Sequence, residues 1–199
     1  MKPLFKKYVF FPIILFFAAM GYSPTVTQHF IYPPFNLKLM FQDTVKRTHV
    51  ELEQVVLGPM NVLYIRDTAA MAGLSEVFEK DYGEIFNFIG ENGLKPGRVM
   101  AFYLNYQNPI TLEAAVEVDQ VPAKLTGRIK AKVVPGGDAI VAHYTGPYEE
   151  LEKPYNEIGN WLKDNKLEAR EIPFEVYLNG PKDVRDVYEL KTDVYQLLK

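Results

Sequence analysis

Two segments of the chain repeat one pattern of apolar and polar positions. Residues 82–94 (YGEIFNFIGENGL) match residues 155–167 (YNEIGNWLKDNKL) at six positions. In both segments apolar residues recur every three to four positions, which predicts an amphipathic helix. Gly93 and Asn165 stand near the ends of the two patterns, where such residues commonly stop a helix. The repeated pattern indicates an internal duplication.

Strand-like runs surround the two predicted helices in the same order. They are 50–56, 61–66, 102–105 and 111–118 in the first copy and 127–133, 139–144, 176–179 and 187–195 in the second. Runs in which apolar and polar residues alternate are typical of half-buried strands. The pattern predicts an α+β fold of two βαββ units, at about 50–118 and 127–197. Each unit is expected to supply half of one mostly antiparallel sheet of about eight strands, with two helices packed on it.

The first 22 residues have a different pattern. Three lysines within the first seven residues precede a mostly apolar run without charges at 8–26. Such a pattern is typical of export signals, and about 20 uncharged residues also suffice to cross a bilayer. We therefore expect an N-terminal hydrophobic helix at 1–22, which is either a signal anchor or a signal peptide cleaved after about Gly21.

Residues 23–46 contain three prolines and no sustained periodicity. This composition predicts a linker between the N-terminal segment and a domain at 47–199. An anchor through residues 8–26 with its lysines on the inside would place the domain on the non-cytoplasmic side of a membrane. Cleavage would instead release a secreted or periplasmic protein.

Composition and charge exclude several classes of function. The net charge of −3 and the pI near 5.7 disfavour a nucleic-acid-binding face. The chain has no cysteine, so thiol catalysis and thiolate metal sites are excluded. Its three histidines are not spaced with carboxylates as metal ligands usually are, and no metal or cofactor is expected. Neither of its two serines lies in a Gly-x-Ser-x-Gly motif, which disfavours a serine hydrolase.

Four runs in the second copy resemble, in order, the GyrI-like or AraC-type effector-binding domain family. They are PGGDAIVAHYTGPY (135–148), Tyr155 with Trp161 and Leu162, EVYLNGP (175–181) and ELKTDV (189–194). The first copy fits the degenerate first half of that family. The resemblance implies a duplicated strand-helix-strand-strand fold that holds small ligands, often cationic or aromatic. Many members carry a DNA-binding helix-turn-helix domain, but no DNA-binding role is expected for this chain.

Glu175 is the first candidate ligand-binding residue. Alternation along 174–178 places Glu175 and Tyr177 on one face of a strand and three apolar residues on the other. The corresponding position in the first copy is Ala101, so only one copy carries the acid. The resemblance implies that a Glu at this place contacts the ligand, and a carboxylate among aromatic rings favours a cation. A solvated Glu on a strand surface is the alternative.

Five aromatic residues complete the candidate site. They are Tyr103, Tyr148, Trp161, Tyr177 and Tyr188. An ordinary core role is the alternative for each of them. Trp161 is favoured because other apolar residues already account for the core stripe of its helix. Tyr103 and Tyr177 are equivalent in the two copies and are expected to face each other. His143, in a predicted strand, is expected to be a hydrogen-bonded structural residue.

These observations favour a membrane-tethered or exported protein that binds a lipophilic, cationic or aromatic small molecule as a sensor or scavenger. The first alternative is a hydrolase, because some similar proteins hydrolyse strained, cyclopropane-containing toxins; Glu175 would then activate water. The second alternative is a membrane interaction or adaptor protein. Haem binding, which a similar duplicated fold in SOUL-type proteins suggests, would depend on His143 as the axial ligand.

Overall fold

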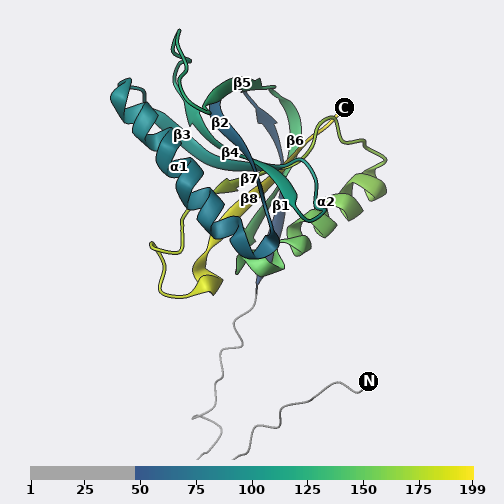
Figure 1. Cartoon of the computed structure of the whole chain (residues 1–199). Helices are drawn as coiled ribbons and strands as arrows, with labels where there is room; N and C mark the ends of the chain where they lie inside the picture. Colours follow the sequence, from purple (N-terminus) through teal and green to yellow (C-terminus); the bar gives the residue numbers. More distant parts are fainter. Residues whose placement is uncertain (1–47) are drawn as a thin grey trace, which may run out of the picture. The chain divides into compact units, whose positions relative to one another are not determined.

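Eight strands and two α-helices make up residues 48–199, the part of the chain that the computed structural model describes (Figure 1). They are β1 (His49–Leu57), β2 (Met60–Ala69), α1 (Leu74–Glu91), β3 (Pro96–Tyr103), β4 (Ile110–Val118), β5 (Lys130–Val134), β6 (Gly137–Thr145), α2 (Glu152–Asn165), β7 (Phe174–Tyr177) and β8 (Lys191–Leu197), with short 3-10 turns η2 (Met71–Gly73), η3 (Tyr148–Glu150) and η4 (Val187–Glu189). The expected α+β architecture is confirmed. The N-terminal hydrophobic helix expected at 1–22 and the linker at 23–46 lie outside the described residues. Within 48–199, no helix has the length and apolarity needed to cross a bilayer.

The strands form one antiparallel sheet in the order β1-β6-β8-β7-β3-β4-β2-β5. Each repeat supplies four strands, as expected, but the two sets are interleaved. The first strand of each copy pairs with the second strand of the other copy: β1 with β6, and β5 with β2. The two copies therefore depend on each other for their edge strands.

A close approach of two turns accompanies this exchange. β1 leads into β2 through Gly58 and Pro59, and β5 leads into β6 through Pro135 and Gly136. A Cβ on Gly136 would lie only 2.7 Å from the carbonyl oxygen of Leu57 and 2.9 Å from the nitrogen of Pro59. Glycine at position 136 thus allows the two turns to touch where the exchanged strands cross.

Two predicted strands begin later than the pattern indicated: the run expected at 127–133 becomes a strand only at Lys130, the first residue of β5, and the other is the last strand of the second copy. Residues 187–195 were expected to be a single strand, but residues 187–189 form η4 and β8 starts at Lys191. The side chain of Asp186 accepts a hydrogen bond from the backbone nitrogen of Tyr188, which holds the turn. Residues 187–189 continue the apolar–polar alternation of β8, which is why the pattern predicted a strand there, but they do not pair with a neighbouring strand.

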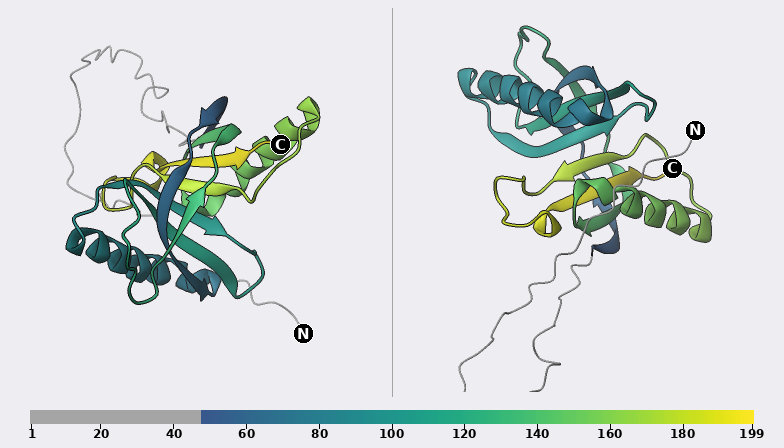
Figure 2. Two further views of the ribbon diagram at one scale, coloured as in Figure 1. Left: turned by 90° about the horizontal axis from the view of Figure 1, so that it is seen from above. Right: turned by 60° about the horizontal axis from the view of Figure 1, so that its bottom comes forward.

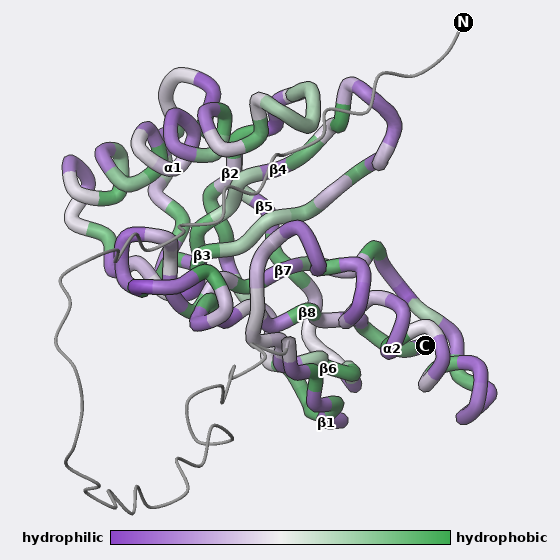
Figure 3. The backbone as a smooth tube through the Cα atoms, turned by 90° about the horizontal axis from the view of Figure 1, so that it is seen from below, coloured by the Kyte–Doolittle hydropathy of each residue, from purple (hydrophilic) through white to green (hydrophobic). Residues whose placement is uncertain are grey.

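Both helices pack on the same face of the sheet and on opposite halves of it (Figure 2). α1 covers a core that includes Leu63, Ile65 and Val116 of β2 and β4. α2 covers a core that includes Ile140 and Val194 of β6 and β8. Figure 3 shows the result along the backbone: apolar residues concentrate in the strands, whereas hydrophilic and hydrophobic residues alternate along the helices.

The helix ends agree with the pattern in one copy and differ in the other. Gly93 follows α1 with a φ of 64°, as the sequence predicted. In the second copy the left-handed residue is Lys166, with a φ of 55°, rather than Asn165. The side chain of Asn165 instead donates a hydrogen bond to the carbonyl of Trp161, one turn earlier.

The opposite face of the sheet holds His143 in a structural position. Its Nδ1 lies 2.7 Å from Oδ1 of Asp193 and its Nε2 lies 3.2 Å from Oε2 of Glu53. Burial lowers the pKa of His143, but the two carboxylates outweigh that effect and raise it above its ordinary value. The expectation of a hydrogen-bonded structural histidine is confirmed. Because both ring nitrogens are engaged, His143 offers no free nitrogen to a haem iron.

Candidate functional site

A row of side chains crosses the face of the sheet that carries the helices. Successive register partners, from β1 to β2, are Leu52, Ala142, Val194, Glu175, Ala101, Ala114 and Ile65. Six members of this Glu175 row are apolar and one is a carboxylic acid. Glu175 lies directly opposite Ala101 across the central pair β7 and β3, which confirms that the two positions correspond. The asymmetry between the copies therefore lies at the centre of the sheet.

The carboxylate of Glu175 is buried and is held by two hydroxyl groups. The residue is 3% exposed, which excludes the alternative of a solvated strand-surface Glu. Tyr155 of α2 donates a hydrogen bond to Oε1 at 2.9 Å, and Tyr177 of β7 donates one to Oε2 at 2.6 Å. Burial raises the pKa of Glu175, and the two hydrogen bonds offset only part of this effect. No positive charge balances the carboxylate among its hydrogen-bond partners in residues 48–199.

Seven aromatic side chains surround Glu175 and form what we call the aromatic cluster. They are Phe78 and Tyr82 of α1, Tyr103 of β3, Tyr106 in the turn that follows it, Tyr148 of η3, Tyr155 of α2 and Tyr177 of β7. The cluster joins the two helices over the central strands.

Ring contacts and hydroxyl contacts connect the cluster across the two copies. The hydroxyl oxygens of Tyr103 and Tyr177 lie 3.4 Å apart, so these equivalent residues do face each other. The ring of Tyr148 meets that of Tyr177 edge to face, with centroids 5.6 Å apart. Tyr106 stacks on Tyr103 at 5.8 Å and is 65% exposed, which makes it the outermost member of the cluster.

Sequence reasoning placed Tyr82 and Tyr155 in the scaffold and missed what their hydroxyl groups do. The two residues are equivalent, but the hydroxyl of Tyr82 donates to the carbonyl of Met100, whereas that of Tyr155 donates to Glu175. The difference follows from Ala101, which offers no side-chain acceptor. The sequence did contain a signal for these contacts, since both copies have a tyrosine at a helix position that faces the core. A buried tyrosine hydroxyl needs a hydrogen-bond partner, so a nearby acceptor could have been predicted.

Phe78 and Tyr106 were also missed, and for different reasons. Phe78 stacks on Tyr82 with centroids 5.5 Å apart and meets Tyr103 and Tyr177 edge to face. It lies one helical turn before residue 82, where the repeated segment begins, so the comparison of the two copies did not include it. Tyr106 lies in a turn, where no periodicity indicates the direction of a side chain.

Two predicted site residues lie elsewhere. Trp161 is partly buried and packs on the core beneath α2. Tyr188 lies in η4, so its expected position on a strand beside Glu175 is wrong. Among the ring contacts of residues 48–199, none joins either residue to the aromatic cluster.

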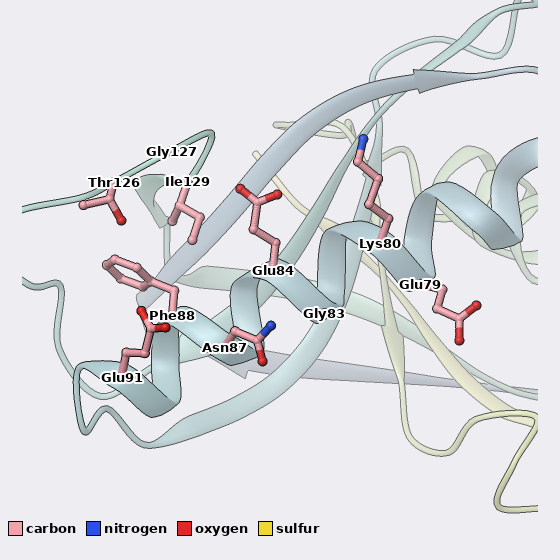
Figure 4. A pocket seen from close by; sticks show the side chains of 10 residues that line it. All are labelled: Glu79, Lys80, Gly83, Glu84, Asn87, Phe88, Glu91, Thr126, Gly127 and Ile129. Atoms are coloured by element: carbon pink, nitrogen blue, oxygen red, sulfur yellow. The ribbon is translucent and has the colours of Figure 1, made fainter.

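A separate hollow of about 480 Å³ lies on the outer side of α1, against residues 126–129 (Figure 4). Charged or polar side chains such as Glu79, Lys80 and Asn87 form much of its wall. Glu84, which also lines it, is already paired with Arg128 at 2.7 Å. Because charged and polar side chains form much of this wall, the buried carboxylate and rings around Glu175 are the better candidate for a site that holds an apolar ligand.

The chemistry available at Glu175 is recognition of positive charge. Burial, with a further contribution from the Glu175 carboxylate, raises the pKa of Tyr103, Tyr155 and Tyr177, so these hydroxyl groups stay neutral. Neutral tyrosines donate hydrogen bonds to the carboxylate and present the faces of their rings to a cation.

Several solved structures share this fold at low sequence identity. EcmrR in its complex with DNA aligns with a TM-score of 0.64 at 19% identity, over 82% of this chain and 62% of that chain. SAV2435 bound to tetraphenylphosphonium aligns with a TM-score of 0.54 at 11% identity, over 75% of this chain and 94% of that chain. A hydrolase from Listeria innocua aligns with a TM-score of 0.56 at 12% identity, over 75% and 92%. These likenesses show a shared fold.

Family membership rests on the sequence itself. This chain spans 62% of the length of the EcmrR chain, and no curated protein matches it. The model of the GyrI-like small molecule binding domain matches residues 51–199, which include all the described strands except the first two residues of β1. The chain therefore belongs to the GyrI-like small-molecule-binding domain family.

Proposed function

We propose that the domain binds a lipophilic cation against Glu175, with the aromatic cluster as the wall of the site. One observation carries the proposal: the single charged member of the Glu175 row is 3% exposed, lies among aromatic rings and, within residues 48–199, has only tyrosine hydroxyl groups as hydrogen-bond partners. A buried carboxylate without a positive partner is costly for a protein to keep. A cationic ligand would supply the missing charge.

Binding would exchange hydroxyl groups for a cation. The hydroxyl groups of Tyr155 and Tyr177 each donate to one carboxylate oxygen, and Glu175 is only 3% exposed, so at least one ring must turn aside for a ligand to reach it. Tyr106 is the most exposed member of the cluster and would move first. A cation over an aromatic face gains about 0.5–2 kcal/mol, and more than one ring is within reach. SAV2435, which shares the fold, is bound to tetraphenylphosphonium, and this supports a lipophilic cation as the ligand.

The affinity for a permanently charged ligand should depend on pH. The charge of tetraphenylphosphonium does not change with pH. The carboxyl group of Glu175, whose pKa is raised by burial, is protonated and neutral below that pKa. We expect the affinity, measured by calorimetry on the full chain, to be constant above that pKa and to fall about tenfold per pH unit below it. Glu175→Gln, which cannot ionise, should remove the dependence. An affinity that is absent throughout, or equal in wild type and variant at every pH, would contradict the proposed function.

The fold shared with a Listeria innocua hydrolase keeps hydrolysis as the second candidate. Glu175 would be the general base, but both of its oxygens accept hydrogen bonds from tyrosines rather than facing a free path to water. In residues 48–199, the side chains in contact with it add no second acid or base that ionises near neutral pH. Binding without turnover is therefore the better-supported role.

We further propose that residues 8–26 tether the domain to a membrane, on its non-cytoplasmic side, where it acts as a sensor or scavenger. The three lysines before that uncharged run support this orientation. The full chain is expected to stay in the membrane fraction after washing with alkaline carbonate, and added protease should reach the domain from outside. Release into the wash, with a new N-terminus after about Gly21, would favour the exported form instead.

A further inference from the structure

Two buried side-chain oxygens in residues 48–199 have no hydrogen-bond partner: Oγ1 of Thr192 and Oδ2 of Asp81. The other oxygen of Asp81 accepts a hydrogen bond from Arg128, so that group belongs to an ion pair. Thr192 is 0% exposed, and its only polar side-chain atom is the unpartnered one. A buried hydroxyl in this state reduces stability, because it loses its hydrogen bonds to water and gains none in return.

Thr192 lies next to Glu175 on the floor of the candidate site. Along β8, Thr192 and Val194 point to the helix-bearing face, and Val194 is the member of the Glu175 row beside Glu175 itself. Thr192 is the register partner of Tyr177 on one side and of Tyr144 on the other. Directly opposed Cβ atoms in an antiparallel pair lie roughly 5 Å apart and diagonal ones roughly 7 Å apart. The hydroxyl of Thr192 is therefore a near neighbour of both Tyr177 and Glu175.

The neighbouring hydroxyl groups do not satisfy Thr192: within residues 48–199 neither forms a hydrogen bond with its Oγ1, and each donates its own hydrogen to another acceptor. Tyr144 donates to the carbonyl of Pro147 at 2.9 Å. Tyr177 donates to Glu175 at 2.6 Å. If the ring of Tyr177 turns aside for a ligand, the hydroxyl of Thr192 becomes part of the surface that the ligand meets. It can then donate or accept one hydrogen bond.

We infer that Thr192 is a second polar contact of the site, and that its ligands are lipophilic cations with a neutral hydrogen-bonding group, such as an alcohol. The inference rests on the proposed function and adds to it. Glu175 and the rings select positive charge and apolar surface, whereas Thr192 selects one substituent. A site built to hydrogen-bond a substituent discriminates against ligands that lack it, since its own polar group is then left unpaired.

Two matched probes test this inference: tetraphenylphosphonium derivatives with a para-hydroxymethyl or a para-ethyl group on one ring. They have nearly the same size and charge but differ in one hydroxyl group. By calorimetry on the full chain, wild type should bind the hydroxymethyl probe about 3- to 10-fold more tightly than the ethyl probe. Thr192→Val should abolish this preference, and Thr192→Ser, which keeps the hydroxyl, should retain it.

Thermal unfolding supplies an independent readout. Thr192→Val removes an unpartnered buried hydroxyl at nearly constant shape, so it should raise the Tm of the ligand-free protein by roughly 2–4 °C. Thr145→Val, at a half-buried position of β6, is the control and should leave the preference between the probes unchanged. Thr192→Ala is a second variant without the hydroxyl, and it should lose the preference even if its packing defect lowers the Tm.

The possible results separate this inference from the proposed function. If wild type binds tetraphenylphosphonium but shows no preference for the hydroxymethyl probe, Thr192 is not a ligand contact and the proposed function stands. If the preference for the hydroxymethyl probe survives in both Thr192→Val and Thr192→Ala, Thr192 is likewise not a ligand contact, and the proposed function still stands. If wild type binds none of the three cations, the proposed function fails, and the role of Thr192 fails with it.

Discussion

Glu175→Gln is expected to weaken the binding of tetraphenylphosphonium by about 100-fold. The change removes the only carboxylate in the Glu175 row and keeps the size of the side chain. Removing one partner of a buried charge pair commonly costs about 2–5 kcal/mol, and about 2.7 kcal/mol corresponds to 100-fold in Kd. Calorimetric titration of the full chain at a pH above the raised pKa of Glu175 measures the effect.

Two controls separate a lost contact from a damaged fold. Glu157→Gln changes the net charge equally at an exposed position of α2 and should leave the affinity unchanged. The pKa of Glu175 is raised in the folded protein, so its contribution to stability decreases as pH rises through that pKa. The stability of wild type relative to Glu175→Gln should therefore decrease as the pH rises through that pKa. If tetraphenylphosphonium binds this variant as tightly as wild type, Glu175 is not the counter-charge.

Arg128→Met is expected to lower the free energy of unfolding by about 3 kcal/mol. Arg128 precedes β5 and donates hydrogen bonds to Asp81 and Glu84 of α1 and to Asp67 of β2, at 2.7–2.8 Å. Asp81 is 0% exposed, so the variant leaves a buried carboxylate without its positive partner. Such a loss commonly costs about 3–5 kcal/mol, and the value here is near the low end because the Arg128 side chain is 38% exposed. Urea unfolding near neutral pH measures it.

The ion pair between Arg98 and Glu117 provides a matched comparison. Their side chains are 36% and 24% exposed, so Arg98→Met should cost only about 0–1 kcal/mol. In the Arg128→Met background, Asp81→Asn should restore much of the lost stability, since it removes the unpaired charge. Burial already raises the pKa of Asp81, and losing Arg128 would raise it further, so the defect of Arg128→Met should shrink as the pH falls. Equal defects in the two arginine variants would contradict this account.

Much of the fold could be predicted because local patterns report how side chains are oriented. The duplicated helix pattern identified α1 and α2, and alternation along 174–178 correctly separated Glu175 and Tyr177 from the apolar face of β7. Comparison of the copies matched Ala101 with Glu175, which lie opposite each other in the sheet. The strand expected at 187–195 failed in its first part because alternation does not distinguish a strand from a short turn that leads into it.

The candidate site was predicted only in part. Glu175, Tyr103, Tyr148 and Tyr177 do come together, as the pattern and the family resemblance indicated. Trp161 packs on the core beneath α2, in line with the alternative of an ordinary core role, and its contact with a ligand stays a prediction.

By itself, the sequence determined the duplication, the faces of the strands and the presence of one acid at a position where the other copy has alanine. Only the tertiary structure decided that β1 and β5 are exchanged between the copies, that Tyr155 donates the second hydrogen bond to Glu175, and that the hydroxyl of Thr192 beside it has no partner within residues 48–199. The physical reason is one of range. Periodicity records the direction of each side chain relative to its own backbone, whereas strand pairing and hydrogen bonds join residues far apart in the chain.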